Sequence, residues 1–355
     1  MGRMALNDQN RSRLMLRDNY VHLEDSGISI DVGTKTFTWT HMEAFQTVEI
    51  INSREWDGNL ENFYRIGEWV AELSFELDEG VLHLLYMPWF TPPILPSDRS
   101  RLGFGVDFDR AVYFSEEGEF FEDRVARQFG FQYELSTAKF DLSAFAIRHI
   151  DRNFFLVGAP EYFEAAPGTF VPIGSSTVPM FFMTNKYGGS FVYSSSESLI
   201  LKSELLYKDF LNDVPVLTAA GETVPIDYGL FSFGLEKSFG FLKDVDQLFL
   251  FEYQRTLSLS KEERLATEIF QHDVFFAWRF SFPGIHEKEL QFGLFYDLDE
   301  GPQTLYVASY SQRWNENFKW SLGYRHFDAP TAGGVTNMRA YNKDHHAYFS
   351  LTANY

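Results

Sequence analysis

The sequence predicts an all-β protein, an antiparallel transmembrane β-barrel of about 16 strands, within a range of roughly 14 to 18. Three observations predict it. Segments of about ten residues alternate apolar and polar side chains, which gives a strand two different faces and matches the length at which a tilted strand crosses a bilayer. The connections between these segments alternate between short and long. Aromatic residues make up 18% of the chain.

Composition excludes several classes of protein. The 355 residues include 30 Lys and Arg against 50 Asp and Glu, a formal net charge of −20, which argues against a nucleic-acid partner because phosphates are neutralised by basic side chains. An acidic disordered chain would be poor in aromatic residues. The absence of cysteine excludes disulfides, cysteine-ligated metals and cysteine nucleophiles. No apolar run reaches the roughly 18 residues of a transmembrane helix, so a soluble β protein or a membrane barrel remains.

The alternation is clearest in the last third of the chain. In residues 274–282 an apolar side chain occupies every second position, and the positions between carry Phe275, Ala277, Arg279 and Ser281. Similar alternation predicts strands at residues 13–23, 28–39, 65–77, 81–90, 126–135, 139–150, 187–194, 198–208, 225–237, 246–257, 273–282, 288–298, 304–313, 318–327 and 346–355. Residues 260–268 form the only helix-like stretch. We expect one barrel domain spanning residues 1–355, with residues 1–12 irregular.

The connections predict a direction for the barrel. Short ones lie at residues 25–27, 78–80, 136–139, 195–197, 283–287 and 315–317, and long ones lie at 40–64, 91–125, 151–186, 209–224, 258–272 and 328–345. Two connections fit this alternation less well. Residues 238–245, in a short position of the series, are of medium length, and residues 299–303, in a long position, are short. Outer-membrane barrels have short periplasmic turns and long extracellular loops. The pattern therefore places the short turns and Tyr355 in the periplasm.

The strand count raises a question of closure. The first and last predicted strands run in the same direction, whereas bacterial barrels have an even number of strands and close with an antiparallel pair. Either one strand lies upstream of this sequence, together with a signal peptide, or one strand is miscounted. The first ten residues, MGRMALNDQN, lack the apolar stretch of a signal peptide.

The second face of the strands carries charged residues that we expect to line the lumen. They are Lys35, Glu68, Glu72, Glu134, Lys202, Glu204, Glu252, Arg279, Glu289, Asp297, Lys319 and Arg325. Charges inside a barrel set ion selectivity, which favours a water-filled channel with acidic and basic clusters. The alternative is a lumen closed by salt bridges among these residues.

Two long connections are candidates for a constriction. Residues 88–125, in which Trp89 is a constriction candidate, combine four prolines with an acidic, aromatic stretch. Loops of this length are usually functional or disordered, so this one either folds inward or contacts lipopolysaccharide or cations at the surface. In the connection 40–64, Asn52 and Arg54 either belong to a constriction or only anchor the loop.

Patterns typical of enzymes are weak in this sequence. The nine histidines include no H-E-x-x-H pattern, and His345 and His346 are adjacent, so no metal site is expected. Glu161 and Glu164 are more typical of a solvated loop than of a catalytic pair. No G-x-S-x-G motif and no glycine-rich phosphate loop occurs. We therefore expect no catalysis and no cofactor.

Several segments resemble a family of bacterial outer-membrane barrels of unknown function that is grouped with porin-like and alginate-export-like channels. The resemblance is carried by residues 32–39 (VGTKTFTW), 50–54 (IINSR) and 87–93 (MPWFTPP), and by the later strands at 248–253, 273–282 and 290–299. Lys35, Thr36 and Thr40 depart from the family pattern. The alternation that ends at Tyr355 also resembles the signal recognised by the barrel-assembly machinery. The resemblance implies an outer-membrane location in a Gram-negative bacterium and implies no substrate.

These observations leave three hypotheses for function. The first is passive passage of a small polar solute, or of a polymer, through an acidic lumen. The second is a plugged, non-conducting barrel with a structural or surface-interaction role. The third, a soluble carbohydrate-binding or hydrolytic β protein, is opposed by the apolar outward faces, which would aggregate in water. The expected partners are outer-membrane lipid and lipopolysaccharide, the assembly machinery and the solute; the oligomeric state is not predicted.

Overall fold

The computed structural model describes most of the chain. The described residues are 2–3, 13–14, 16–56, 64–96, 113–116, 119–121, 125–153, 155–166, 169–195, 198–213, 215–218, 221–268, 270–299, 303–329 and 342–353. Tyr355, most of the expected irregular segment 1–12, and much of the connection 88–125 lie outside them.

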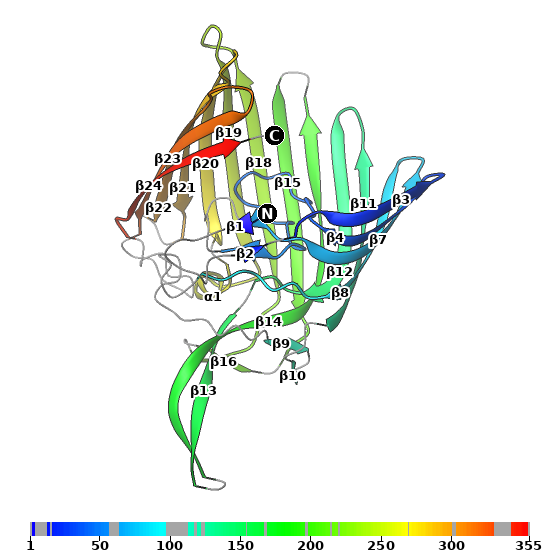
Figure 1. Ribbon diagram of the computed structural model, residues 1–355, viewed down its shortest axis with the longest axis vertical. Helices are drawn as coiled ribbons and strands as arrows, with labels where there is room; N and C mark the ends of the chain where they lie inside the picture. Colours follow the sequence, from blue (N-terminus) through cyan, green and yellow to red (C-terminus); the bar gives the residue numbers. More distant parts are fainter. Residues whose placement is uncertain are drawn as a thin grey trace.

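Fifteen long strands form one antiparallel ladder that curves into a barrel (Figure 1). Each pairs with the next in the order β3 (Asn19–Asp25), β4 (Ile28–Lys35), β7 (Glu68–Leu77), β8 (Gly80–Trp89), β11 (Val125–Ser136), β12 (Phe140–Ile150), β14 (Thr169–Ser194), β15 (Leu199–Phe210), β18 (Tyr228–Phe239), β19 (Asp246–Leu257), β20 (His272–Phe282), β21 (Lys288–Asp297), β22 (Thr304–Arg313), β23 (Phe318–Asp328) and β24 (His345–Ala353). The predicted all-β, porin-like barrel is confirmed, and each predicted strand corresponds to one of the fifteen.

The remaining elements are short and lie in the connections. They are β1 (Gly2–Arg3), β2 (Arg13–Leu14), β5 (Arg54–Glu55), β6 (Tyr64–Arg65), β9 (Tyr113–Glu116), β10 (Glu119–Phe121), β13 (Phe155–Ala166), β16 (Val216–Thr218), β17 (Gly221–Thr223) and α1 (Lys261–Thr267). The helix α1 falls within the helix-like stretch expected from the sequence. Ser260 caps it through a reciprocal capping box with Glu263.

One predicted connection is wrong in part. Residues 151–186 were expected to be a loop, but they contain β13 and the first half of β14, whose registers run from Phe155 with Met180 to Ala166 with Thr169. This hairpin extends beyond the barrel at the end where the long connections lie (Figure 1). Strict apolar alternation is needed only where one face of a strand differs from the other in its surroundings. These residues do not alternate strictly, which is why the sequence pattern missed them.

The two faces of the ladder differ as the alternation predicts. Trp278 and Phe292 are cross-strand neighbours on the outer face and are 40% and 48% exposed. Phe275 and Phe295, also cross-strand neighbours, face inward and are buried. The exposed outer side chains are thus large and apolar, and the polar and charged side chains of the same strands turn into the barrel.

The two outermost strands run in the same direction. β3 leads into a short turn at residues 26–27, and β24 comes from the long connection at residues 329–344 and also runs toward the short-turn end. Within the described residues no ladder register joins β24 to β3. All seven residues of β3 are exposed, as are eight of the nine in β24.

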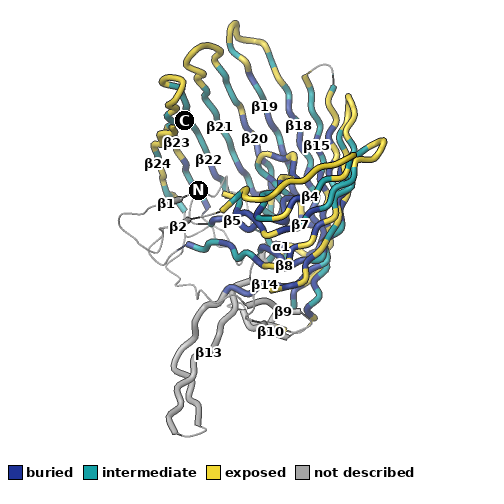
Figure 2. Tube along the Cα trace, turned by 45° about the vertical axis from the view of Figure 1, so that its right-hand side comes forward, coloured by how far each residue is buried: buried dark blue, intermediate teal, exposed yellow. Residues whose placement is uncertain are grey.

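The apolar core lies inside the barrel, toward the long-connection end. Buried positions gather around β5, β8 and α1, whereas the short turns at the opposite end are exposed (Figure 2). The largest cluster joins wall residues such as Phe145, Leu206 and Leu230 to Phe37 and Trp39, which precede β5. Within the described chain, no helix has the length and apolar character needed to span a membrane.

Candidate functional site: an inward segment and the cavity beside it

Residues 36–53, between β4 and β5, fold into the barrel and pack on its inner wall; we call them the inward segment. Two buried carboxylates from distant wall strands hold it. The first is Glu204 of β15, which is 1% exposed. It accepts hydrogen bonds from the Thr40 hydroxyl (2.8 Å) and from the backbone N–H groups of His41 (2.7 Å) and Val48 (3.2 Å).

The second carboxylate is Glu252 of β19, which is fully buried. It accepts three backbone N–H groups in a row, from Glu43 (2.7 Å), Ala44 (2.9 Å) and Phe45 (3.0 Å). Hydrogen bonds to an ionised acceptor are shorter and stronger than neutral ones. Glu204 and Glu252 together satisfy backbone groups that would otherwise lie unpaired inside the barrel.

The inward segment is also braced internally. The Asn52 side chain accepts a hydrogen bond from the Phe37 N–H (3.0 Å) and donates to the Phe37 carbonyl and to Glu49 Oε1 (2.6 Å each). Glu49 accepts a further bond from the Trp39 N–H at 3.3 Å and pairs with Arg65 at 3.2 Å. Asn52 therefore closes the segment into a loop whose two ends lie side by side.

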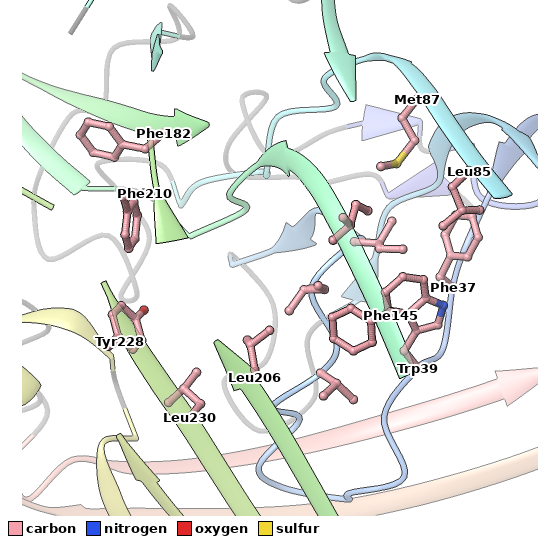
Figure 3. Close-up of a cluster of buried hydrophobic side chains, with 14 of the residues drawn as sticks. Phe37, Trp39, Leu85, Met87, Phe145, Phe182, Leu206, Phe210, Tyr228 and Leu230 are labelled. Carbon is pink, nitrogen blue, oxygen red and sulfur yellow. The ribbon is translucent and has the colours of Figure 1, made fainter. Parts of the chain in front are cut away.

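Apolar contacts fix the segment against the wall. Figure 3 shows Phe37 and Trp39 beside Phe145 of β12, and the ring centroids of Trp39 and Phe145 are 4.8 Å apart. On the opposite side, Phe45 makes edge contacts with Phe295 of β21 at 6.0 Å. The segment thus contacts the wall on both sides.

A buried ion pair supports the end of the segment. Arg152, just after β12, binds both carboxylate oxygens of Glu68 at 3.0 Å and donates to the Ile51 carbonyl at 3.0 Å. Glu68 in turn accepts the Ser53 N–H at 2.8 Å. Removing either Arg152 or Glu68 would leave an uncompensated buried charge, so loss of one partner would strongly destabilise this part of the barrel.

A second ionic cluster lies beside this pair. Asp151 accepts from Lys186 of β14 at 2.7 Å and lies 3.5 Å from Lys208 of β15, which also binds Glu268 at 2.7 Å. Burial of the Asp151 carboxyl works to raise its pKa, but the two ammonium groups outweigh this and hold the pKa below its ordinary value. The Asp151 carboxyl therefore stays ionised, and through Lys208 and Glu268 the cluster ties the wall to the end of α1.

A cavity of about 520 Å³ remains between the inward segment and the opposite wall. The segment contributes residues 38, 40–44 and 46, and the wall contributes side chains of β19 to β24. Its charged lining residues are Glu43, Arg65, Arg279 and Arg325. Its volume is in the range of small-molecule sites.

The residues predicted to line the lumen divide into groups. Glu68, Glu204 and Glu252 contact the inward segment or its support, and Arg279 and Arg325 line the cavity. Others pair along the inner wall. Lys35 binds Asp31 and Glu72, Lys202 binds Glu236, Glu134 accepts from Gln132, and Asp297 accepts from Gln271. Glu289 and Lys319 lie near the short-turn ends of β21 and β23, away from the cavity lining.

The three residues predicted to form a constriction, Asn52, Arg54 and Trp89, do not lie together. Asn52 is buried as the internal brace, and Arg54 donates to the Glu49 carbonyl at 3.0 Å. Trp89 ends β8, is 42% exposed and is absent from the lining of the cavity. The structure brings Asn52 and Arg54 together but leaves Trp89 apart from them.

Several residues of the site were not predicted, notably Thr40, Arg65 and Arg152. Arg152 and Arg65 lie in or beside connections, and nothing in their local sequence indicates what they contact. One clue was present, because an exposed loop would not be expected to carry the apolar run Val48, Ile50 and Ile51. Within the described residues, no group of three His, Asp or Glu side chains is arranged to hold a metal ion.

No protein-family model and no curated protein matches the chain. Among solved structures, it is similar to Wzi of Escherichia coli, a carbohydrate-binding β-barrel of the outer membrane involved in group 1 capsule assembly, with 10% identity and a TM-score of 0.48 over 94% of this chain and 69% of that one. It is also similar to OccAB4 of Acinetobacter baumannii (8% identity, TM-score 0.45, 94% and 72% covered) and to OccK8 of Pseudomonas aeruginosa (7%, 0.43, 94% and 79%). At these values the similarities carry no argument about function.

Proposed function

We propose that the protein is a porin-like channel of the bacterial outer membrane, a single barrel that lets a small polar solute pass and catalyses no reaction. The cavity of about 520 Å³ beside the inward segment carries this proposal, because it provides space lined by polar and charged side chains inside the barrel. A constriction of this kind limits passage to small solutes. The exposed apolar side chains of the outer face support a location in lipid.

The same segment supports the second candidate, a plugged barrel with a structural or surface-interaction role. Six hydrogen bonds to Glu204 and Glu252 hold the segment across the interior. If that attachment completely blocks the barrel, no solute passes.

Single-channel recording separates the two functions. The refolded protein, checked for heat-modifiable migration, is added to a planar lipid bilayer in symmetrical salt. Discrete current steps support the channel. A folded barrel that gives no steps overturns it and leaves the plugged barrel as the function to pursue.

A further inference from the structure

The cavity beside the inward segment has a charge opposite to that of the whole chain. Arg279 of β20, Arg325 of β23 and Arg65 of β6 line it. Glu43 is the one carboxylate among its lining residues. A protein with a net charge of −20 thus turns three guanidinium groups and one carboxylate toward this cavity.

Several acidic residues of the inward segment and the inner wall already have partners. The oxygens of Glu204 and Glu252 are occupied by N–H and hydroxyl groups of the inward segment. Glu49 pairs with Arg65 and Asn52. Elsewhere on the inner wall, Glu236 is held by Lys202. These four carboxylates therefore bind other groups of the barrel, and none of them is among the residues that line the cavity.

Arg279 differs from Arg65, which pairs with Glu49. Among the described residues no carboxylate lies within ion-pair distance of it, and its Nε is buried without a hydrogen-bond partner. Its cross-strand neighbours are the uncharged Leu248 and Gln291. A guanidinium in a partly desolvated place is stabilised by an anion that can enter.

Arg325 places a second guanidinium on the same lining. It is 8% exposed, contacts His346 Nδ1 at 3.0 Å and lies over the ring of Tyr348 at 4.7 Å. These contacts hold its planar group in position beside the cavity. Uncharged donors and acceptors, including Gln291 and Ser309, complete that wall.

We infer that the cavity binds and preferentially passes small oxyanions, of the carboxylate or phosphate kind, with Arg279 as the main selecting residue. A guanidinium presents paired N–H donors that match the two oxygens of such a group. The inference rests on the proposed channel and names its substrate class. It also reverses the cation preference that the acidic composition would predict.

The test measures reversal potential across a bilayer in a KCl gradient and, separately, binding of inorganic phosphate to the refolded barrel. The wild type is expected to prefer the anion. Arg279→Gln is expected to remove most of that preference and to weaken phosphate binding by about tenfold or more, the scale of one charge-assisted contact. Arg279→Glu is expected to reverse the preference. Lys243→Gln, in the exposed turn after β18, removes the same charge away from the cavity and is the matched control.

The outcomes are distinguishable. Cation preference in the wild type, or the same preference in Arg279→Gln, overturns the inference while leaving the channel intact. Absence of any conductance overturns the channel. Phosphate binding then tests the oxyanion site by itself: binding by the wild type that is lost in Arg279→Gln supports the site, and absence of binding by the wild type overturns it. Heat-modifiable migration of each variant shows that it has folded, and Arg279→Gln, which changes size little, serves if Arg279→Glu does not fold.

Discussion

At the scale of single residues, two buried glutamates, Glu204 and Glu252, accept hydrogen bonds from backbone N–H groups of the inward segment. Glu252 shows this most directly, because both of its oxygens face three consecutive N–H groups of the inward segment. An ionised carboxylate suits that position because it accepts from several donors and donates to none. The consequence is that its negative charge is not available to a passing ion.

Replacing Glu252 by Gln tests this role. One amide oxygen remains as an acceptor, but the NH₂ group then faces N–H donors, so at least one bond worth about 1.5–3 kcal/mol is lost. The inward segment should be held less firmly, and single-channel current should become larger or noisier than that of the wild type. Glu316→Gln, which removes an exposed acid from the turn before β23, is the control. Identical current traces for Glu252→Gln and the wild type would contradict the anchoring role.

At the scale of elements, the fifteen strands of the ladder were predictable, whereas the sequence left open whether the connection 40–64 forms a constriction or an anchored loop. Alternation such as that of residues 274–282 arises because one face of the strand contacts lipid and the other faces the interior. It is a local property of the chain. The inward segment depends on hydrogen bonds that join positions 164 and 209 residues apart, from Thr40 to Glu204 and from Glu43 to Glu252. The sequence identified both glutamates as inward-facing, but periodicity contains no information about which loop they contact.

The orientation of the strands can be tested with one pair of substitutions. Phe276 of β20 lies on the outer face opposite Leu294 of β21, whereas Ser281 of the same strand faces inward beside Glu289. Phe276→Arg places a charge in the bilayer and should lower the free energy of unfolding from lipid vesicles by about 2–4 kcal/mol. Ser281→Arg should cost much less, since it remains in the lumen near a carboxylate. Equal losses in the two variants would show that the assigned faces are wrong.

Two carboxylates attach α1 to the barrel: Glu268 at its C-terminal end, which binds Lys208, and Asp299. Asp299, in the connection after β21, accepts from Arg264 of α1 at 2.5 and 3.0 Å and from His272 at 2.9 Å. Burial works to raise the pKa of Asp299, but the bonds from His272 and Arg264 outweigh it and hold the pKa below its ordinary value. A carboxyl with a lowered pKa stabilises the folded state above its unfolded pKa of about 4, and this contribution disappears as the pH falls through the lower folded value.

Hydrogen exchange should report that attachment. We expect Asp299→Asn to raise amide exchange in residues 261–267 at neutral pH, with little change in the barrel strands. In the wild type the same rise should appear only when the pH falls below about 4. Protection of α1 that is identical in Asp299→Asn and the wild type would contradict its dependence on Asp299.

At the scale of the whole molecule, net charge and local charge lead to opposite expectations. The net charge of −20 sums the charges of loops, of the anchoring carboxylates and of paired groups. It describes the long-range field of the protein and not the field inside the barrel. An ion inside the barrel is affected by the few groups within a screening length, where Arg279 and Arg325 dominate the lining. Selectivity therefore follows from which charges are already paired, and that pairing is visible only in three dimensions.

The two outermost strands lead to the last prediction. β3 and β24 run in the same direction, and both turn apolar side chains outward, among them Val21 and Leu23 on one and Phe349 and Leu351 on the other. Backbone N–H and C=O groups in a bilayer must be hydrogen-bonded, because no water is present to replace a strand partner. We therefore expect the amides of both strands to be paired when the barrel is in lipid.

Hydrogen exchange in vesicles measures this directly. Amides of residues 19–25 and 345–353 should exchange as slowly as those of the interior strand β20, and much faster after transfer to a denaturant. Exchange in vesicles at the rate of the exposed turn at residues 283–287 would contradict the prediction and would mean that these two strands lie outside the hydrocarbon region. Because the chain has no native cysteine, a complementary measurement is available. A disulfide between cysteines introduced at Leu23 and Leu351 would show that the two strands lie next to each other, and its absence alongside slow exchange would mean that another strand pairs with each of them.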